Sequence, residues 1–158
     1  MPVWAPRGQT PLVRVAPQRD KTNFYGSLDL RTGRETVGET PKMDSEHTAV
    51  YLEQILVAYP ECPILLLWDR APWHYGPAIR DVLAANPRLE LMYFPTATPD
   101  LNPQEHVWKA ARSEVSHNHT ERRLSTLAAD FKQYLVDHTF TSPLLDQYGF
   151  TAVCPMFM

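Results

Sequence analysis

Asp100-Leu-Asn-Pro-Gln-Glu-His-Val-Trp108 combines the start of a helix with a carboxylate in the first helical turn. Asn102 suits the N-cap position, since its side chain can accept a hydrogen bond from a backbone N–H without a helical partner. Pro103 suits the first helical position, where its missing N–H costs nothing. Glu105 is then the third helical residue, near the positive end of the helix dipole. Trp108 follows three residues later on the same face.

An apolar run upstream ends in a second carboxylate. Ile64-Leu-Leu-Leu-Trp68 is uninterrupted and bounded by Pro63 and Asp69, which is typical of a buried central strand. Open α/β sheets build their sites at the carboxyl ends of strands, where Asp69 lies. The interval from Asp69 to Glu105 can hold a helix, a strand and a loop that return the chain beside the first strand. We therefore expect the two carboxylates to converge, as a site for a hard divalent metal requires.

Each carboxylate also has a purely structural interpretation. Asp69 can be a solvated residue in the turn that follows a strand. Asn102 and Glu105 have the spacing of a capping box, in which the glutamate reaches back to the N–H of the cap residue. A phosphatase with a nucleophilic aspartate is disfavoured, because such enzymes need a second aspartate two residues on, where this chain has Ala71.

Five further residues are candidates for contacts with nucleic acid. Trp73 can stack on a base or pack in the core, and His74 can bind a phosphate, position a carboxylate or be an ordinary satisfied histidine. Cationic side chains on the helix after Pro103 can contact phosphates or form a solvated face. The candidates are Trp73, His74, Asn102, Lys109 and Arg112. The pair His117-Asn-His119 is a poor metal site, since residues two apart point in different directions on a helix.

Composition excludes several classes of protein. The 158 residues suit one domain, and the net charge of −3 gives no overall basic field, so nucleic-acid binding must use a local patch. The two cysteines are too few for a disulfide framework or a cysteine-rich zinc site, and we interpret them as reduced thiols in a cytosolic protein. No apolar run approaches the roughly 20 residues of a membrane helix, so no membrane association is expected.

The first half of the chain predicts antiparallel strands. Residues 22–30 alternate, which predicts a half-buried strand. Phe24, Gly26, Leu28 and Leu30 lie on one face, and Tyr25, Ser27 and Asp29 lie on the other, less apolar face. The turn Arg31-Thr-Gly-Arg34 and a returning strand over 35–40 complete a hairpin. A short strand over Leu12-Val-Arg-Val15 would extend it to a meander.

The second half predicts strand–helix–strand units. Apolar residues at helical spacing follow Asp44 or Ser45 as a cap, Pro77 opens a second helix, and residues 89–94 form a strand. Helices then run from Pro103 to about Ser116 and over the apolar positions between residues 124 and 135. Such units favour parallel strands joined by right-handed crossovers. The prediction is an α/β fold with one mixed sheet, in a domain over residues 1–140 followed by an irregular tail over 141–158.

These segments resemble the catalytic core of DDE-type transposases, of the mariner superfamily and its bacterial insertion-sequence relatives. The stretch from Leu66 to His74 resembles the family strand that ends in Asp and is followed by a His. The stretch from Phe94 to Trp108 resembles the family strand that ends in Pro, its Leu-Asn-Pro-x-Glu segment and the Trp after it. Trp4-Ala-Pro-Arg-Gly-Gln-Thr-Pro11 resembles the segment after the family's first catalytic strand. Arg70, Ala97 and Gln104 depart from the usual Asn, Tyr and Ile.

The resemblance implies a ribonuclease H-like fold, with an antiparallel meander first, and cleavage and strand transfer of DNA. In the family three carboxylates hold two Mg²⁺ ions, which Mn²⁺ can replace. By resemblance Asp69 is the second carboxylate and Glu105 the third. The partners implied are transposon ends and target DNA. A homodimer is also implied, because transposition uses at least two catalytic domains.

The first carboxylate of the family lies on a strand upstream of the Trp-Ala-Pro segment. We therefore expect an N-terminally truncated domain with an incomplete triad, unless an upstream polypeptide supplies that strand. Asp20, Asp29 and Asp44 are the available substitutes. Because the missing strand would be central, the sheet would carry a gap or an exposed edge.

Three functional hypotheses follow. The leading one is a transposase catalytic domain. The alternative from another class is a non-catalytic remnant or interaction module that keeps a ribonuclease H-like shape. A third is a ribonuclease H-like nuclease for another nucleic acid. Changing Glu105 to Gln separates the first two, since a pure capping role alters no activity.

Overall fold

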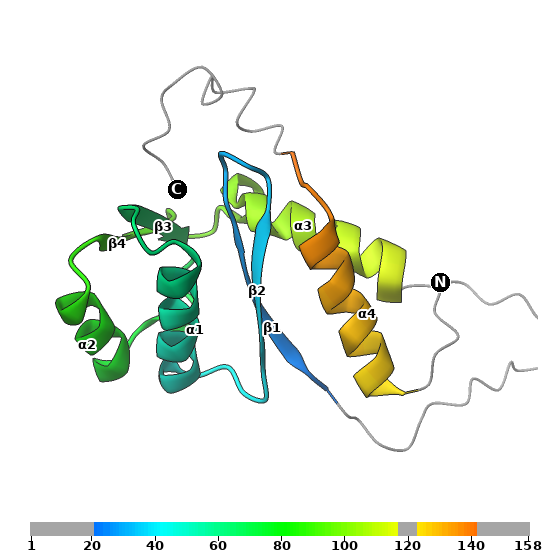
Figure 1. Ribbon diagram of the computed structural model, residues 1–158, viewed down its shortest axis with the longest axis horizontal. Coiled ribbons are helices and arrows are strands. Elements are labelled where there is room, and N and C mark those ends of the chain that lie inside the picture. Colours follow the sequence, from blue (N-terminus) through cyan, green and yellow to red (C-terminus); the bar gives the residue numbers. More distant parts are fainter. Residues whose placement is uncertain (1–20, 117–122, 142–158) are drawn as a thin grey trace, which may run out of the picture.

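A computed structural model describes residues 21–116 and 123–141 of the chain. Its strands and helices occur in the predicted order, and Figure 1 shows the strand hairpin between two groups of helices. The predicted strand over 12–15, the candidate Asp20, the 117–119 histidine pair and all of the predicted tail except residue 141 lie outside the described residues. The elements are β1 (Asn23–Leu28), β2 (Glu35–Thr40), α1 (Ser45–Ala58), β3 (Ile64–Trp68), α2 (Pro77–Ala85), β4 (Leu89–Tyr93), α3 (Pro103–Ala111) and α4 (Leu124–Asp137).

The β1–β2 hairpin is antiparallel, as predicted, with a register that runs from Asn23 opposite Thr40 to Leu28 opposite Glu35. Gly33 adopts φ of +72° in the turn, a conformation that glycine reaches without steric cost. Its N–H donates to the carbonyl of Asp29 at 2.7 Å. The turn prediction is therefore confirmed.

Helices cover both faces of the hairpin, whereas the sequence predicted a half-buried strand (Figure 1). On one face Tyr25 is only 6% exposed and stacks on Tyr51 of α1, with ring centroids 4.9 Å apart. The other face packs on α3 and α4 in a cluster whose buried members are Val37, Val107, Ala111 and Leu135. The prediction failed at Tyr25. Alternation assigned this residue to the less apolar face of the strand, but a large aromatic ring is unfavourable in water and is buried under α1 instead.

Helix α1 is fixed at both ends by side chains. Asp44 caps its start, and its carboxylate accepts a hydrogen bond from the His47 N–H at 2.9 Å. Beyond its end, the Arg88 guanidinium donates to the carbonyls of Leu56 at 2.8 Å and Cys62 at 2.9 Å, and also to that of Tyr59. This arginine precedes β4, so it ties the end of α1 to the start of that strand.

Strands β3 and β4 are parallel, with Ile64 opposite Leu89 and Trp68 opposite Tyr93. Helix α2 connects them and packs against α1, so the predicted strand–helix–strand unit is confirmed. Buried side chains of β3, β4, α1 and α2 share one core with Tyr25. Asp69 follows β3 directly, at the carboxyl end of a strand.

The described strands form two separate two-stranded sheets where the sequence predicted one mixed sheet. Strand pattern fixes the pairing within each pair, but the two pairs share no hydrogen-bonded ladder in the described residues. A groove lies between β1 and β3 instead. Helix α3 also differs from expectation, because regular turns end at Ala111 and a π-helical segment continues over Arg112–Ser116. Within the described part of the chain, no helix is both long and apolar enough to cross a membrane.

Candidate metal and nucleic-acid site

Asp69 is presented to solvent by the turn after β3, with 57% of its side chain exposed. Its Oδ1 accepts a hydrogen bond from the Ala71 N–H at 3.0 Å and lies 3.0 Å from Nδ1 of His74. The same His74 nitrogen is 2.9 Å from the Asp69 backbone carbonyl. One oxygen of the carboxylate is thus engaged by the turn, while Oδ2 makes no hydrogen bond within the described residues.

His74 is the residue that orients Asp69. It ends the 3-10 turn Pro72–His74, and its ring stacks on Trp68 with centroids 4.2 Å apart. Burial lowers the pKa of His74, and its contacts with Asp69 act in the opposite direction. A neutral imidazole that donates from Nδ1 toward Asp69 leaves Nε2 as an acceptor.

Glu105 lies in the first turn of α3, as predicted, and its side chain is exposed. Asn102 is the N-cap, but its side chain accepts from the Gln104 N–H at 3.1 Å rather than from the Glu105 N–H. The Glu105 carboxylate makes no hydrogen bond or ion pair with any described residue, so the reciprocal half of a capping box is not formed. The capping-box interpretation therefore explains why a helix starts here, but it gives no structural role to the Glu105 carboxylate.

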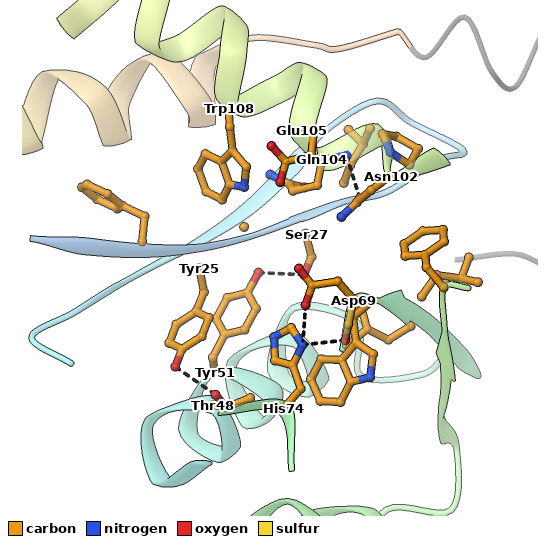
Figure 2. A pocket seen from close by; sticks show the side chains of 18 of the residues that line it. Tyr25, Ser27, Thr48, Tyr51, Asp69, His74, Asn102, Gln104, Glu105 and Trp108 are labelled. Atoms are coloured by element: carbon orange, nitrogen blue, oxygen red, sulfur yellow. Dashed lines mark hydrogen bonds and ion pairs between the residues drawn. The ribbon is translucent and has the colours of Figure 1, made fainter. Parts of the chain in front are cut away.

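Asp69 and Glu105 line the same groove between β1 and β3. Figure 2 shows Glu105 and Trp108 entering it from α3 on one side, with Asp69 and His74 on the other. Hydroxyl groups of β1 and α1 lie at the same groove, where Tyr51 donates to Ser27 Oγ at 2.8 Å. The expected convergence of the two carboxylates on one groove is thus observed.

The candidates for nucleic-acid contacts divide into two groups. Trp73, His74 and Asn102 line the groove with the carboxylates, and Trp73 also packs against the core shared by α1 and β3. Lys109 and Arg112 do not line it, because they lie exposed farther along α3 and in the π-helical segment. The structure thus brings three of the five residues to the carboxylates.

The two substitutes for a first carboxylate that lie within the described residues, Asp29 and Asp44, have structural roles instead. Asp29 is 5% exposed, and its carboxylate accepts the Arg31 N–H at 2.9 Å and the Tyr59 hydroxyl at 3.3 Å. Asp44 is occupied as the α1 cap, and its hydrogen bonds from His47 hold its pKa at about 2. Neither residue lines the groove.

Sequence reasoning missed one titratable residue beside the first turn of α3. Glu35 begins β2 and accepts a hydrogen bond from Nε2 of Gln104 at 3.0 Å. Burial raises the pKa of Glu35 to about 7, although the hydrogen bond from Gln104 lowers it. Alternation along the strand could have predicted the burial of Glu35, since residues two apart lie on the same face and Val37 is buried.

The two groove carboxylates match the ligand chemistry of Mg²⁺ but do not form a complete cage. Mg²⁺ is usually held by one or two carboxylates together with waters and substrate phosphates, and Asp69 and Glu105 offer that many. In residues 21–116 and 123–141, no group of three or more His, Cys, Asp or Glu side chains is placed to hold a metal ion. The residues present therefore fit a metal that also needs ligands from elsewhere.

A profile of the DDE superfamily endonucleases matches residues 1–128, which include both carboxylates and the whole groove. The chain belongs to this superfamily. It is similar to the insertion element IS630 uncharacterized 39 kDa protein of Shigella sonnei, with 27% identity over 118 residues, 73% of this chain and 34% of that protein. It is also similar to the uncharacterized protein y4pE/y4sA of Sinorhizobium fredii, with 28% identity over 96 residues, 60% of this chain and 68% of that protein.

Membership in the DDE superfamily endonucleases confirms the resemblance seen in the sequence. The mixed α/β architecture, with an antiparallel pair before a parallel pair, agrees with a domain of this class. The chain spans about a third of the length of the Shigella sonnei protein.

Proposed function

We propose that this chain is the catalytic domain of a transposase, in which Asp69 and Glu105 are two members of the carboxylate set for DNA cleavage and strand transfer. The observation that carries the proposal is the shared groove, to which Glu105 brings a carboxylate that has no partner among residues 21–116 and 123–141. An exposed carboxylate at a helix start keeps its full capacity for a cation, since no protein hydrogen bond has to be broken.

In this proposal Asp69 and Glu105 hold Mg²⁺, for which Mn²⁺ can substitute. The chemistry supplied by the bound ion is activation of a water or a 3′-hydroxyl and stabilisation of the leaving oxygen. The chain itself positions the ligands. His74 and Ala71 orient Asp69, and the Asn102 cap fixes the turn that carries Glu105. Trp73, His74 and Asn102 contact the DNA at the groove, and Lys109 and Arg112 contact phosphates outside it.

We further propose that an upstream polypeptide supplies the first strand and its carboxylate, and that this strand occupies the groove between β1 and β3. Two features support this. In the described residues, β1 pairs only with β2 and β3 only with β4, so each strand has an edge without a partner strand. Such edges are templates for strand addition. A strand in the groove would join the two pairs into the single mixed ribonuclease H-like sheet of a 1–140 domain. Strand transfer at two transposon ends would use a homodimer.

The alternative is a non-catalytic remnant or interaction module with a ribonuclease H-like fold. One observation favours it: the described residues provide no group of three metal-binding side chains. In that case the two groove carboxylates have no catalytic role in this chain.

The test combines the purified chain with Mn²⁺ and supercoiled plasmid DNA, with and without a peptide carrying an apolar strand that ends in Asp. We expect nicking when the peptide is present, and loss of at least about a hundredfold in Glu105→Gln or Asp69→Asn, as for removal of a group that stabilises developing charge. Glu114→Gln, at an exposed glutamate of the π-helical segment, is the matched control and should nick normally. Nicking that never occurs would support the remnant hypothesis, and nicking that survives Glu105→Gln would show that Glu105 is not one of the catalytic carboxylates.

A further inference from the structure

Three side chains converge on Gly26 at the centre of β1, at the side of the groove that α3 forms. A Cβ atom added at Gly26 would meet Gln104 Nε2 at 2.6 Å, Trp108 Cη2 at 2.7 Å and Glu35 Oε2 at 2.8 Å. Gly26 is thus required for close approach, because any larger residue would displace these groups. The hydrogen bond from Gln104 to Glu35 joins α3 to β2 across 69 positions of the sequence.

The hydrogen bonding of this cluster is incomplete when Glu35 is ionised. Glu35 Oε1 and Gln104 Oε1 are both buried and have no hydrogen-bond partner in the described part of the chain. Both atoms are acceptors, and the hydrogens of the Gln104 amide lie on Nε2, which already donates to Glu35 Oε2. Leaving two buried acceptors unsatisfied is unfavourable. A proton on Glu35 Oε1 would supply the missing donor, because a carboxylic acid O–H can donate to an amide oxygen such as Gln104 Oε1.

We propose that Glu35 is held as a neutral carboxylic acid in a two-hydrogen-bond pair with Gln104, and that this Glu35–Gln104 pair positions Glu105. Gln104 directly precedes Glu105 in the first turn of α3, so a fixed Gln104 side chain fixes the backbone from which Glu105 projects. Glu35 is a positioning residue and touches no reacting group. Only the importance of Glu105 rests on the proposed function, since the pair itself does not depend on it.

The surroundings of Glu35 favour the neutral form. None of the ion pairs among the described residues includes it. β1 places Leu28 opposite it, and α4 contributes Phe131, Tyr134 and Leu135 to the neighbouring cluster. The titratable and charged groups on the elements around it include Tyr51 of α1, Tyr59, Tyr134 of α4, Arg31 and Arg34 of the turn, and Glu105 and Lys109 of α3. Of these, Arg31 pairs with Asp29 at 4.0 Å. The pKa of about 7, raised by burial, agrees with a proton held at neutral pH.

The direction of the pH effect follows from the raised pKa. Between the usual value of 4.5 and about 7, the folded chain holds a proton that the unfolded chain releases. The stabilisation is therefore complete below pH 4.5 and is lost as the pH rises through about 7. Within that window the unfolding equilibrium constant increases by at most about tenfold per pH unit for one proton.

The experiment compares the full chain with Glu35→Gln and with Glu39→Gln, a matched control at an exposed position of the same strand. Infrared spectra at pH 6 should show the C=O band of a neutral carboxyl group in the parent and in Glu39→Gln, and no such band in Glu35→Gln. Hydrogen exchange at pH 8 should find the amides of residues 104–108 less protected in the parent than in Glu35→Gln, whose amide pair cannot ionise.

Two outcomes would overturn the proposal. One is a parent spectrum at pH 6 without a neutral carboxyl band, which would mean that Glu35 is ionised and its oxygens are satisfied by water. The other is equal protection of residues 104–108 in the parent and Glu35→Gln at pH 8, which would leave Glu35 without a positioning role. If Glu35→Gln folds poorly, Gln104→Met removes the pair from the α3 side and should leave residues 104–108 less protected than in the parent at pH 6. Neither readout needs metal or DNA, so this proposal and the transposase proposal can fail separately.

Discussion

Glu35 and Glu105 are associated with the same helical turn but have opposite surroundings. Glu35 is largely buried, accepts one hydrogen bond and has a pKa near neutrality. Glu105 is exposed and has no partner among the described residues. A buried carboxylate with a single partner stabilises the fold only in its neutral form. An exposed carboxylate without a partner contributes little to folding, so it is free for a ligand. The three substitutions below test this division.

Gly26→Ala should have the largest effect, because it disturbs the buried side of the turn. The new methyl group would lie within 2.8 Å of three side-chain atoms, and overpacking of this kind costs about 1–3 kcal/mol in free energy of unfolding. Urea denaturation measures the loss. Adding Gln104→Ala should recover part of it, since the amide is one of the three obstacles. If Gly26→Ala left the free energy of unfolding unchanged, Glu35 and Gln104 would not be closely packed against Gly26.

Asn102→Ala should have an intermediate effect, because it removes the cap that serves both sides of the turn. The Asn102 side chain accepts the Gln104 N–H, and loss of such a cap typically costs about 1 kcal/mol. Thermal unfolding followed by circular dichroism gives the change. Asn102→Asp keeps the acceptor and should retain the stability. Equal losses in both variants would contradict the capping role.

Glu105→Gln should have the smallest effect on folding. The exposed carboxylate lies near the positive helix end, an interaction worth about 0.3–1 kcal/mol. We expect a net change within about 0.5 kcal/mol in denaturant titrations without metal. A loss above about 1 kcal/mol would mean that Glu105 is a structural residue. The division between the two glutamates would then fail.

Local signals in the sequence predicted what local interactions determine. The Asn102 cap, the Gly33 turn and the Asp44 cap are formed by residues a few positions apart, and all three predictions are confirmed. The position of Glu105 was predicted, but its lack of a hydrogen bond to Asn102 was not, because spacing permits a capping box without requiring one. Spacing also indicated that Asp69 and Glu105 converge on one region.

Contacts distant in the sequence were beyond prediction. Glu35 contacts Gln104 only because α3 packs on the hairpin. The residues next to Glu35 in the sequence give no indication that its partner is a glutamine side chain. Tyr25 was assigned to the less apolar face, but α1 buries it. Strand patterns likewise predicted an antiparallel and a parallel pair correctly, yet alternation within a strand carries no information about which strand lies beside it.

The separation of the two strand pairs has a mechanical consequence. Asp69 extends from the β3–β4 pair, while Glu105 extends from a helix packed on the β1–β2 pair. Across the described residues, α1 and packed side chains join these two bodies, and side chains slide against one another far more easily than a hydrogen-bonded ladder shears. The distance between the Asp69 and Glu105 carboxylates can therefore change at low energetic cost. A ligand bound by both carboxylates would link the two strand pairs directly. The stiffness of the whole domain would then depend on whether that ligand is bound.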